Sequence, residues 1–278
     1  MDMTSENSNN RFGKGLAPGS HHYRAFIGPP EIYDICSAMQ FNLITFLGLR
    51  QDDLLLDIGC GSLCAGKLFI PYLLPGCYFC MEPEQWLIDE GIKNELGKDI
   101  INIKAPVFSN DSDFTCSLFN KKFDYILAHS IFSHTSQAQI KRCLSQVKEC
   151  MKPSSIFAAT FWMGKDDYTG DKWEYSTCVT YTLERIVQLC LEHGLICEPI
   201  DWPHPTQKWV LIARPENVEH VRDLVDSCNT DTLRKQLSFY KTRLYKLEDH
   251  PYVKFGLRIK RGVRRILRMM QGIKFLMN

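Results

Sequence analysis

The residues best suited to chemistry in this 278-residue sequence lie in a short run at 54–61, which reads Leu-Leu-Leu-Asp-Ile-Gly-Cys-Gly. The stretch that follows it, residues 65–74, has the apolar spacing of a helix. Ligands of open α/β sheets bind outside the carboxyl ends of the strands, and glycine lets a backbone approach them without an intervening Cβ. The residues expected to line a ligand-binding loop are Asp57, Gly59, Cys60 and Gly61.

Two classes of cofactor use a loop of this kind. A dinucleotide site prefers Gly-x-Gly-x-x-Gly, with the start of a helix facing the pyrophosphate. In this sequence Cys64 occupies the position of the third glycine, and the next glycine is Gly66. This departure weakens the case for a dinucleotide such as NAD.

Residues 54–61 resemble the first motif of the Rossmann-like (class I) S-adenosylmethionine-dependent methyltransferases, and further segments follow in that family's order. The resemblance implies that the methionine and ribose part of the cofactor lies against Asp57 and the glycines. It also implies that Glu82, after the apolar run at 77–81, accepts hydrogen bonds from both ribose hydroxyls, because two carboxylate oxygens match the two donors of a vicinal diol. Glu82 could instead cap the helix that follows it.

Two later segments extend the resemblance towards the adenine and the transferred methyl group. Residues 111–114 resemble the turn that meets the adenine amino group, with Asp113 preferred over Asp111, although Asp113 could instead form an Asx turn. Residues 123–130 resemble the family's fourth strand, whose end borders the methyl group. The residues expected beside the cofactor at that strand end are Ala128, His129 and Ser130.

A narrower resemblance covers residues 23 to about 215. It is to a prokaryotic branch of these methyltransferases that is often associated with surface-polysaccharide or lipid-linked glycan metabolism. The matching segments are Tyr23-Arg24, Gly61-Ser62-Leu63, Ile70-Pro71-Tyr72-Leu73, residues 82–88 and residues 130–135. The branch often has arginine after Gly-Ser-Leu, where this sequence has Cys64, and this departure puts an anion contact from that helix in doubt.

Methyl transfer from a sulfonium is an in-line displacement in which the protein mainly positions a nucleophile. A phenol, hydroxyl or carboxylic acid acceptor also benefits from a general base near neutral pH, which histidine provides. The candidates are His134, directly after the fourth strand, and His204, in a polar and aromatic loop before the last strand. His134 could instead cap or pack the next helix, and His204 could belong to a rigid turn bracketed by prolines. The loop at 164–173 mixes acids with aromatics, which suits both a glycan-binding loop and a solvated turn.

The pattern of apolar runs predicts the elements that position these residues. Helical spacing occurs at 32–48, 65–74, 84–96, 137–151 and 182–193. Strands are expected at 54–58, 77–81, 101–104, 123–128, 155–161, 196–200 and 209–213. This alternation predicts an α/β, doubly wound, mostly parallel sheet, and the last two strands predict an antiparallel hairpin at its edge.

Composition divides the chain into a cofactor-binding domain and its extensions. Residues 1–20 are rich in Asn, Ser and Gly and are expected to be disordered, and residues 21–215 form the expected domain. Residues 216–250 have the pattern of a helix with a short heptad seam at 233–247, which could support self-association or pack against the domain itself. The seam residues are Leu233, Leu237, Tyr240, Leu244 and Leu247.

The last part of this C-terminal helical extension, residues 251–278, has the pattern of a basic amphipathic helix, with apolar residues on one side and arginines and lysines on the other. Such a helix can lie in an anionic membrane interface. It could equally bury its apolar side on the protein itself or on a partner. Nucleic-acid binding is not expected, because few aromatic residues are interleaved with the basic ones.

The rest of the sequence predicts a cytoplasmic protein, and the basic helix adds the hypothesis of a peripheral position at the inner membrane face. The N-terminus lacks the pattern of a secretory signal, and no apolar run is long enough to span a bilayer. The 12 cysteines are therefore expected to be reduced and mostly buried. Cys60 with Cys64 and Cys77 with Cys80 have metal-ligand spacing, but one pair lies in the cofactor loop and the other enters a strand, so no metal site is expected.

These observations favour an S-adenosylmethionine-dependent methyltransferase that acts on a glycan, a lipid-linked acceptor or a small molecule, most simply by O-methylation. A second hypothesis is a catalytically idle module that keeps the cofactor-binding fold and uses its tail for assembly. A third, less favoured, is an NAD-dependent oxidoreductase.

Overall fold

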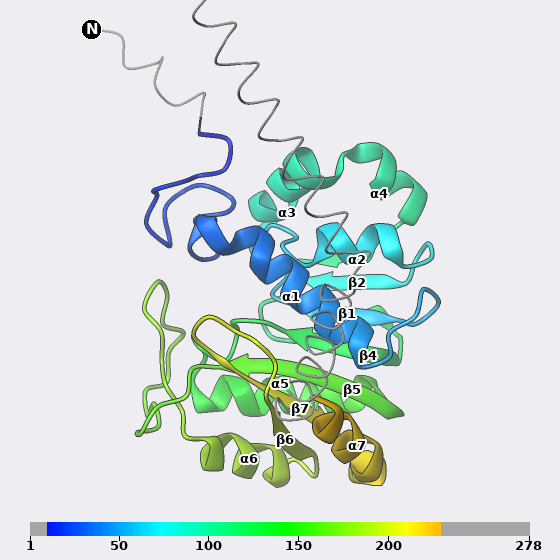
Figure 1. Cartoon of the computed structure of the whole chain (residues 1–278), viewed down its shortest axis with the longest axis vertical. Helices are drawn as coiled ribbons and strands as arrows, with labels where there is room; N and C mark the ends of the chain where they lie inside the picture. The colour runs from blue at the N-terminus through cyan, green and yellow to red at the C-terminus, as the bar shows by residue number, and fades with distance from the viewer. Residues whose placement is uncertain (1–9, 229–278) are drawn as a thin grey trace, which may run out of the picture. The chain divides into compact units, whose positions relative to one another are not determined.

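The computed structural model describes residues 10–228; residues 1–9 and 229–278 lie outside that part. Its centre is a seven-stranded sheet with the order β3-β2-β1-β4-β5-β7-β6 (Figure 1). β7 runs antiparallel to β5 and β6, and the other neighbouring pairs are parallel. The expected doubly wound sheet with an antiparallel edge hairpin is confirmed. Its strands are β1 (Leu55–Ile58), β2 (Tyr78–Met81), β3 (Val107–Ser109), β4 (Phe123–Ala128), β5 (Met151–Phe161), β6 (Ile196–Ile200) and β7 (Lys208–Ala213).

Helices cover both faces of the sheet. The first face carries α1 (Tyr33–Phe46), α2 (Gly66–Tyr72), α3 (Gln85–Gly91), α4 (Lys98–Lys104) and α7 (Val218–Cys228). The second face carries α5 (Gln137–Cys150) and α6 (Leu183–Glu192). The shorter helical turns are η1 (Pro30–Ile32), the π-helical η2 (Ile92–Leu96), η3 (Cys116–Phe119) and η4 (Pro215–Asn217).

Each strand contributes side chains to two separate hydrophobic cores, one on each face of the sheet, because successive side chains of a strand point to opposite faces. Leu55 and Tyr78 belong to the core beside α1 and α2, whereas their neighbours Leu56 and Phe79 belong to the core beside α5. All four side chains are buried. A strand that is covered on both faces needs apolar residues at every position, which explains the continuous leucine run that leads into the glycine loop.

The helices of the second face begin at side-chain caps. The Oγ of Ser136 accepts a hydrogen bond from the backbone N–H of Gln139 at 3.3 Å, and Gln139 Oε1 accepts one from the backbone N–H of Ser136 at 2.9 Å. This reciprocal capping box starts α5 directly after the segment that leaves β4. Thr182 caps α6 in a similar way, since its Oγ1 accepts from the backbone N–H of Arg185.

The strand expected at 101–104 is wrong, because these residues form the last turn of α4. Ile100, Ile101 and Lys104 are the half-buried positions of this short helix, and they have helical rather than alternating spacing. The left-handed residue Ala105 ends the helix, and Pro106 follows it. The third strand of the sheet is β3, which starts only at Val107.

The two ends of the described part also differ from the expected boundaries. Residues 10–20, which were expected to be disordered, form turns in which the backbone N–H of Lys14 donates to Asn10 and that of Gly15 donates to Glu31. At the other end, α7 packs against β6 and β7 and buries Val221. The packed domain therefore continues past residue 215, because amphipathic α7 needs the sheet to cover its apolar side. The seam at 233–247 and the basic segment at 251–278 lie outside the described residues.

Within residues 10–228, every helix is too short or too polar to cross a bilayer.

The capping box of α5 yields a stability prediction. Ser136→Ala removes the acceptor for the Gln139 N–H, so we expect the free energy of unfolding to fall by about 1 kcal/mol. Urea denaturation of both proteins measures this difference. Ser112→Ala changes an exposed serine outside any helix cap and serves as the matched control. Equal losses in both variants would contradict the role of the cap.

Candidate functional site

β1 ends where the order of the strands reverses. It has β2 on one side and β4 on the other, and all three strands are parallel. In open α/β sheets the crevice outside the carboxyl ends at such a point is where ligands bind. The loop that leaves β1 there contains Gly59 and Gly61, whose φ angles of 72° and 53° lie in the left-handed region that favours glycine. The topology therefore places the glycine loop at the expected binding crevice.

Glu82 holds the glycine loop against the end of β2. Its Oε2 accepts a hydrogen bond from the backbone N–H of Gly61 at 2.9 Å, and its Oε1 accepts one from the backbone N–H of Glu84 at 3.0 Å. Burial raises the pKa of Glu82, and these two backbone donors oppose that rise. A carboxylate has about four lone-pair sites, so each oxygen can accept one further hydrogen bond. Two adjacent oxygens with remaining acceptor capacity are what a vicinal diol requires.

Asp57 lies enclosed in the core beside β2. The Tyr78 hydroxyl donates to its Oδ2 at 2.7 Å, and the aspartate is only 2% exposed. Burial raises the pKa of Asp57 to about 7, while the Tyr78 hydrogen bond lowers it and the Glu82 carboxylate raises it. Burial and the same aspartate also raise the pKa of Tyr78. The observed contact makes Asp57 a support for the strand that carries the loop.

Cys60 contributes its backbone to the loop, while its side chain contacts β2. Its Sγ lies 3.0 Å from the Sγ of Cys80, and burial raises the pKa of both thiols. Cys64 instead contacts the backbone carbonyl of Tyr33 at 3.3 Å. Within residues 10–228, no three His, Cys, Asp or Glu side chains are grouped so as to hold a metal ion.

Asp113 lies in the turn between β3 and η3. Its side chain is exposed and pairs with Arg142 of α5 at 2.7 Å. The neighbouring Asp111 forms the turn, because it accepts from the backbone N–H groups of Asp113 and Thr115. The residue of this segment that contacts the β2 end is Asn110, whose Nδ2 donates to the Glu82 carbonyl at 2.9 Å. The adenine contact expected of Asp113 remains a prediction.

The end of β4 meets the loop between β6 and β7. Ala128 is buried in the sheet opposite Ala159, and the two residues after it turn towards other segments. His129 Nε2 lies 3.0 Å from His204 Nε2. Ser130, whose φ is 59°, donates its backbone N–H to Thr160 Oγ1 at 2.7 Å. The structure thus brings together His129 and His204, which are 75 residues apart in the sequence.

Both rings of the histidine pair are half-buried. Burial lowers the pKa of His129 to about 3, and its neighbour His204 contributes to this lowering. Burial alone lowers the pKa of His204 to about 4. Gln207, which the sequence analysis missed, joins the pair to Ser130 by donating from Nε2 to Ser130 Oγ at 2.7 Å. Its position after a proline-bracketed histidine was the only signal in the sequence.

His134 fastens the loop after β5 to the start of α5. Its Nδ1 lies 2.8 Å from the carbonyl oxygen of Glu174 and 2.9 Å from that of Thr177, so the Nδ1–H donates to both. The backbone N–H of Glu174 donates in return to the His134 carbonyl at 2.8 Å. The Trp173 ring packs beside the imidazole, with ring centroids 5.6 Å apart. These contacts are those of a residue that orders a loop, and a role as general base remains a prediction for its Nε2.

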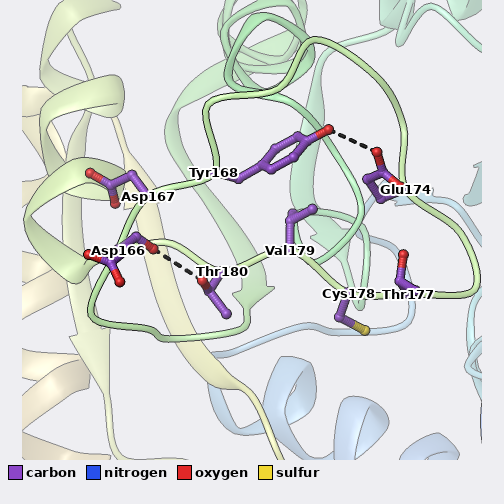
Figure 2. Close-up of a pocket in the computed structure, with 8 residues that line it drawn as sticks. All are labelled: Asp166, Asp167, Tyr168, Glu174, Thr177, Cys178, Val179 and Thr180. Carbon is purple, nitrogen blue, oxygen red and sulfur yellow. Dashed lines mark hydrogen bonds between the residues drawn. The ribbon is translucent and has the colours of Figure 1, made fainter.

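A cavity of about 350 Å³ lies within this loop (Figure 2). The Tyr168 hydroxyl donates to Glu174 at 3.1 Å, and Thr180 Oγ1 donates to the Asp166 carbonyl at 3.1 Å. Asp167 accepts from the backbone N–H and the hydroxyl of Thr182 at the start of α6. The acids and aromatics of the loop thus maintain its own shape, and glycan contact by the loop remains a prediction.

Apolar and aromatic side chains from distant segments gather around the glycine loop. A Cβ on Gly59 would lie 2.0 Å from Ile131 Cδ1, and a Cβ on Gly61 would lie 2.9 Å from Ile27 Cγ2. Phe26 packs near Trp86 and Tyr175, with ring centroids 5.1 Å and 5.2 Å apart. Burial and, next, the charge of the Glu82 carboxylate raise the pKa of Tyr175 to about 12. The sequence analysis found none of these contacts.

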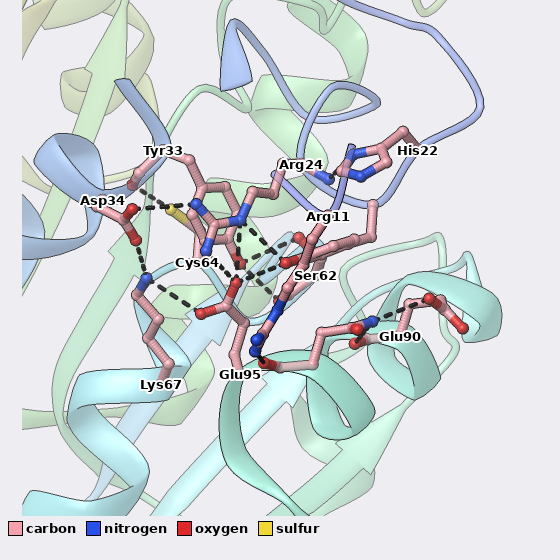
Figure 3. A network of polar contacts seen from close by, with 12 residues as sticks. Arg11, His22, Arg24, Tyr33, Asp34, Ser62, Cys64, Lys67, Glu90 and Glu95 are labelled. Carbon is pink, nitrogen blue, oxygen red and sulfur yellow. Dashed lines mark hydrogen bonds and ion pairs between the residues drawn. The ribbon is translucent and has the colours of Figure 1, made fainter. Parts of the chain in front are cut away.

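An ionic network, buried except for the exposed carboxylate of Asp34, ties the N-terminal segment to the helices beside the loop (Figure 3). The Arg24 side chain, 5% exposed, pairs with Asp34 at 3.0 Å and with Glu95. Lys67 of α2 pairs with the same two acids. The Tyr33 ring lies 4.4 Å from the Arg24 guanidinium. Two cations and two anions balance, as buried charges require. The network therefore holds the Phe26 and Ile27 segment in place.

Comparison with known proteins identifies the fold. No protein-family model matches the chain, and no curated protein matches it in sequence. Magnesium protoporphyrin IX methyltransferase from Synechocystis PCC 6803 with bound SAH has a TM-score of 0.50 at 10% identity, covering 73% of this chain and 90% of that one. An S-adenosylmethionine-dependent methyltransferase from Clostridium acetobutylicum ATCC 824 has a TM-score of 0.48 at 14% identity, covering 66% and 92%. The chain has the fold of class I S-adenosylmethionine-dependent methyltransferases.

Enclosure of Asp57 generates a prediction about the pH dependence of stability. The folded-state pKa of about 7 lies above that of an unfolded aspartate, so the folded state binds more protons between about pH 4 and pH 7. The contribution of Asp57 to stability is therefore present at low pH and is lost as the pH rises through about 7. We expect Asp57→Asn, which keeps an acceptor for Tyr78, to gain stability relative to the wild type over this range, by on the order of 4 kcal/mol at most.

Urea denaturation at a series of pH values measures this difference. Asp52→Asn, at an exposed position, is the matched control and should parallel the wild type at every pH. A constant difference between Asp57→Asn and the wild type from about pH 4 to pH 8 would show that Asp57 does not take up a proton on folding.

Proposed function

We propose that the protein is an S-adenosylmethionine-dependent methyltransferase whose cofactor binds at the carboxyl ends of β1 and β2. The observation that carries this proposal is the link between the glycine loop and Glu82, through the backbone N–H of Gly61, at the point where the strand order reverses. The likeness of fold to magnesium protoporphyrin IX methyltransferase, which was crystallised with SAH, supports the choice of cofactor.

The residues around the loop fit this cofactor. Glu82 keeps one free acceptor position on each oxygen for the ribose hydroxyls, since only one backbone N–H occupies each. Gly59 and Gly61 allow close approach of the backbone, and Tyr175 packs with Phe26, the neighbour of Ile27. When bound, S-adenosylmethionine supplies an electrophilic methyl group on a sulfonium. The protein would hold the cofactor, exclude water with Ile27 and Ile131, and orient an acceptor at the end of β4.

The acceptor is proposed to be an oxygen of a glycan, a lipid-linked molecule or a small molecule. The narrower sequence resemblance supports this choice, as does the mixture of polar and aromatic groups at His129, Ser130 and His204 near the end of β4. Action in the cytoplasm at an anionic membrane face is proposed from residues 251–278, which lie outside the described part.

Replacement of Glu82 tests the cofactor site. Glu82→Gln removes the charge that accepts from the ribose hydroxyls, and hydrogen bonds to charged groups contribute about 1.5–3 kcal/mol. We therefore expect the Kd for S-adenosylmethionine, measured by calorimetry, to rise by roughly 10- to 100-fold. Glu84→Gln is the matched control, because that side chain is exposed and contacts Trp86.

Two further measurements, thermal denaturation and NAD binding, complete this test of the cofactor site. Thermal denaturation of each variant verifies that the fold is kept. An unchanged Kd in folded Glu82→Gln would mean that the site is misassigned, and tighter binding of NAD than of S-adenosylmethionine would favour an oxidoreductase.

Transfer of a labelled methyl group tests the activity itself. The protein is incubated with labelled S-adenosylmethionine and cell extract, which is then separated into lipid, glycan, small-molecule, protein and RNA fractions. We expect the label in the lipid, glycan or small-molecule fraction. Absence of label from every fraction would favour an idle cofactor-binding module.

A further inference from the structure

The histidine pair at the end of β4 has a defined proton arrangement. His204 Nδ1 accepts hydrogen bonds from the backbone N–H groups of Gln207 at 2.8 Å and Thr206 at 3.1 Å. A ring nitrogen that accepts carries no proton, so neutral His204 carries its proton on Nε2. That Nε2–H donates to His129 Nε2, 3.0 Å away. Neutral His129 must therefore carry its own proton on Nδ1.

The Nδ1–H of His129 is the donor that this arrangement leaves for a ligand. Among residues 10–228, no protein group forms a hydrogen bond with this nitrogen, and the residue is only half-buried. The ring is held from its other side, because Trp209 packs beside it with centroids 5.6 Å apart. A fixed, unpaired donor at the end of β4 is what an acceptor-binding group requires.

Two buried polar atoms close to this pair also lack partners within the described part of the chain. They are Gln207 Oε1 and Trp209 Nε1. Buried polar groups are normally hydrogen-bonded, and an unpaired one needs an explanation such as a ligand or water. Gln207 contacts Ser130 through Nε2, so its orientation is set and its carbonyl remains available. The cluster therefore has unused hydrogen-bonding capacity beyond His129.

We propose that the methyl acceptor presents a carboxylate to the Nδ1–H of His129, and that His204 is a positioning residue that maintains this tautomer of His129. This inference rests on the proposed methyl-transfer function, because it concerns the acceptor side of the same site. The carboxylate could belong to an acidic sugar of a glycan or to a small organic acid, and both share the chemistry that His129 would recognise.

The electrostatics of the pair favour a carboxylate over an alcohol. Neither ring keeps a free lone pair to take a proton from an acceptor, because His204 Nδ1 and His129 Nε2 already accept hydrogen bonds and the other two ring nitrogens carry protons. Burial also lowers the pKa of both rings, which keeps them neutral at neutral pH. An alcohol needs a base to remove its proton, whereas a carboxylate is already ionised and accepts a hydrogen bond. In the transfer, a carboxylate oxygen forms the new bond to the methyl carbon as the bond to sulfur breaks with its electron pair going to sulfur. No proton is released, so no base is required.

Histidine NMR tests the tautomer without any acceptor. In the full-length protein labelled with nitrogen-15 at histidine, we expect His129 to show a protonated Nδ1 and a bare Nε2, and His204 to show the reverse, from about pH 5.5 to 8. His204→Phe should convert His129 to a mixture of tautomers. His204→Gln, which offers an amide N–H in place of Nε2–H, should preserve the original one. The resonances of His193, the C-cap residue of α6, should not move in any variant.

A protonated Nε2 on His129 in the wild type would overturn the assignment. Retention of the Nδ1–H form in His204→Phe would overturn the positioning role. A change in the His193 resonances of His204→Phe would indicate that this variant misfolds. In that case the positioning role is judged from the His129 tautomer in the wild type and in His204→Gln, and loss of the Nδ1–H form in His204→Gln would overturn it.

Binding of a simple probe tests the ligand class. Benzoate added to the protein loaded with S-adenosylhomocysteine should shift the His129 Nδ1 resonance in a saturable way, whereas neutral benzyl alcohol should not. His204→Phe should weaken benzoate binding by roughly 10-fold, the value of about one charged hydrogen bond. Equal shifts with both probes, or none with benzoate, would contradict a carboxylate site.

The product distinguishes this inference from the proposed function. Label transferred in cell extracts should be released as methanol by mild alkali, because methyl esters hydrolyse there and methyl ethers do not. Alkali-stable label would keep the methyltransferase and overturn the carboxylate acceptor. Failure of S-adenosylhomocysteine to bind would overturn the proposed function. The tautomers of His129 and His204 are measured in the protein without ligand, so that result does not depend on cofactor binding.

Discussion

The hydrogen bond from the backbone of Gly61 to the carboxylate of Glu82 is the constraint on which the candidate site depends. It joins the loop after β1 to the end of β2, two strands that already pair in parallel. Because the loop residues have positive φ angles, the backbone can turn sharply enough for this contact. Asp57 and Cys60 then reinforce the same junction from within the core through Tyr78 and Cys80. The buried carboxylate of Glu82 thus lies at the carboxyl ends of β1 and β2, and each of its oxygens can accept one more hydrogen bond.

The surroundings of this junction come from segments far apart in the sequence. The ionic network of Arg24, Asp34, Lys67 and Glu95 attaches the N-terminal segment to α2 and η2. That attachment holds Phe26 and Ile27 against the loop. On the opposite side His134 holds the segment that carries Tyr175. Each of these two segments is therefore fastened by its own polar contacts, and the Phe26 and Tyr175 rings pack where the segments meet.

The polar cluster at the end of β4 contrasts with the usual use of histidine as a base. Burial favours the neutral forms of His129 and His204, since a charged imidazole would lose its hydration without gaining a carboxylate partner. Neutral rings linked nitrogen to nitrogen form a directional chain that starts at the backbone N–H groups of Thr206 and Gln207. These hydrogen bonds fix the orientation and the tautomer of both rings and leave no free lone pair to receive a proton. The outer donor of this chain suits an acceptor that arrives already ionised.

The sequence by itself determined the fold class, the strand that carries the glycine loop and the acid after β2. Apolar runs followed by Asp57, Gly59 and Glu82 are local patterns, and strand alternation with helices has few topological solutions. It misassigned residues 101–104, because an alternating Ile-Asn-Ile run and one short helical turn look alike without their packing partners.

Only the tertiary structure decided how the candidate side chains group. It paired Asp113 with Arg142, placed His134 in hydrogen bonds with the loop after β5, and brought His129 into contact with His204, 75 residues away in the sequence. It also added Gln207 and Tyr175, whose contacts depend on loops that have no periodic pattern. The physical reason is that the periodicity of a helix or strand, and the conformation of a glycine turn, depend mainly on residues that are neighbours in the sequence. The burial of a histidine, the proton on its ring and the partner of a carboxylate are set by residues that only folding brings together.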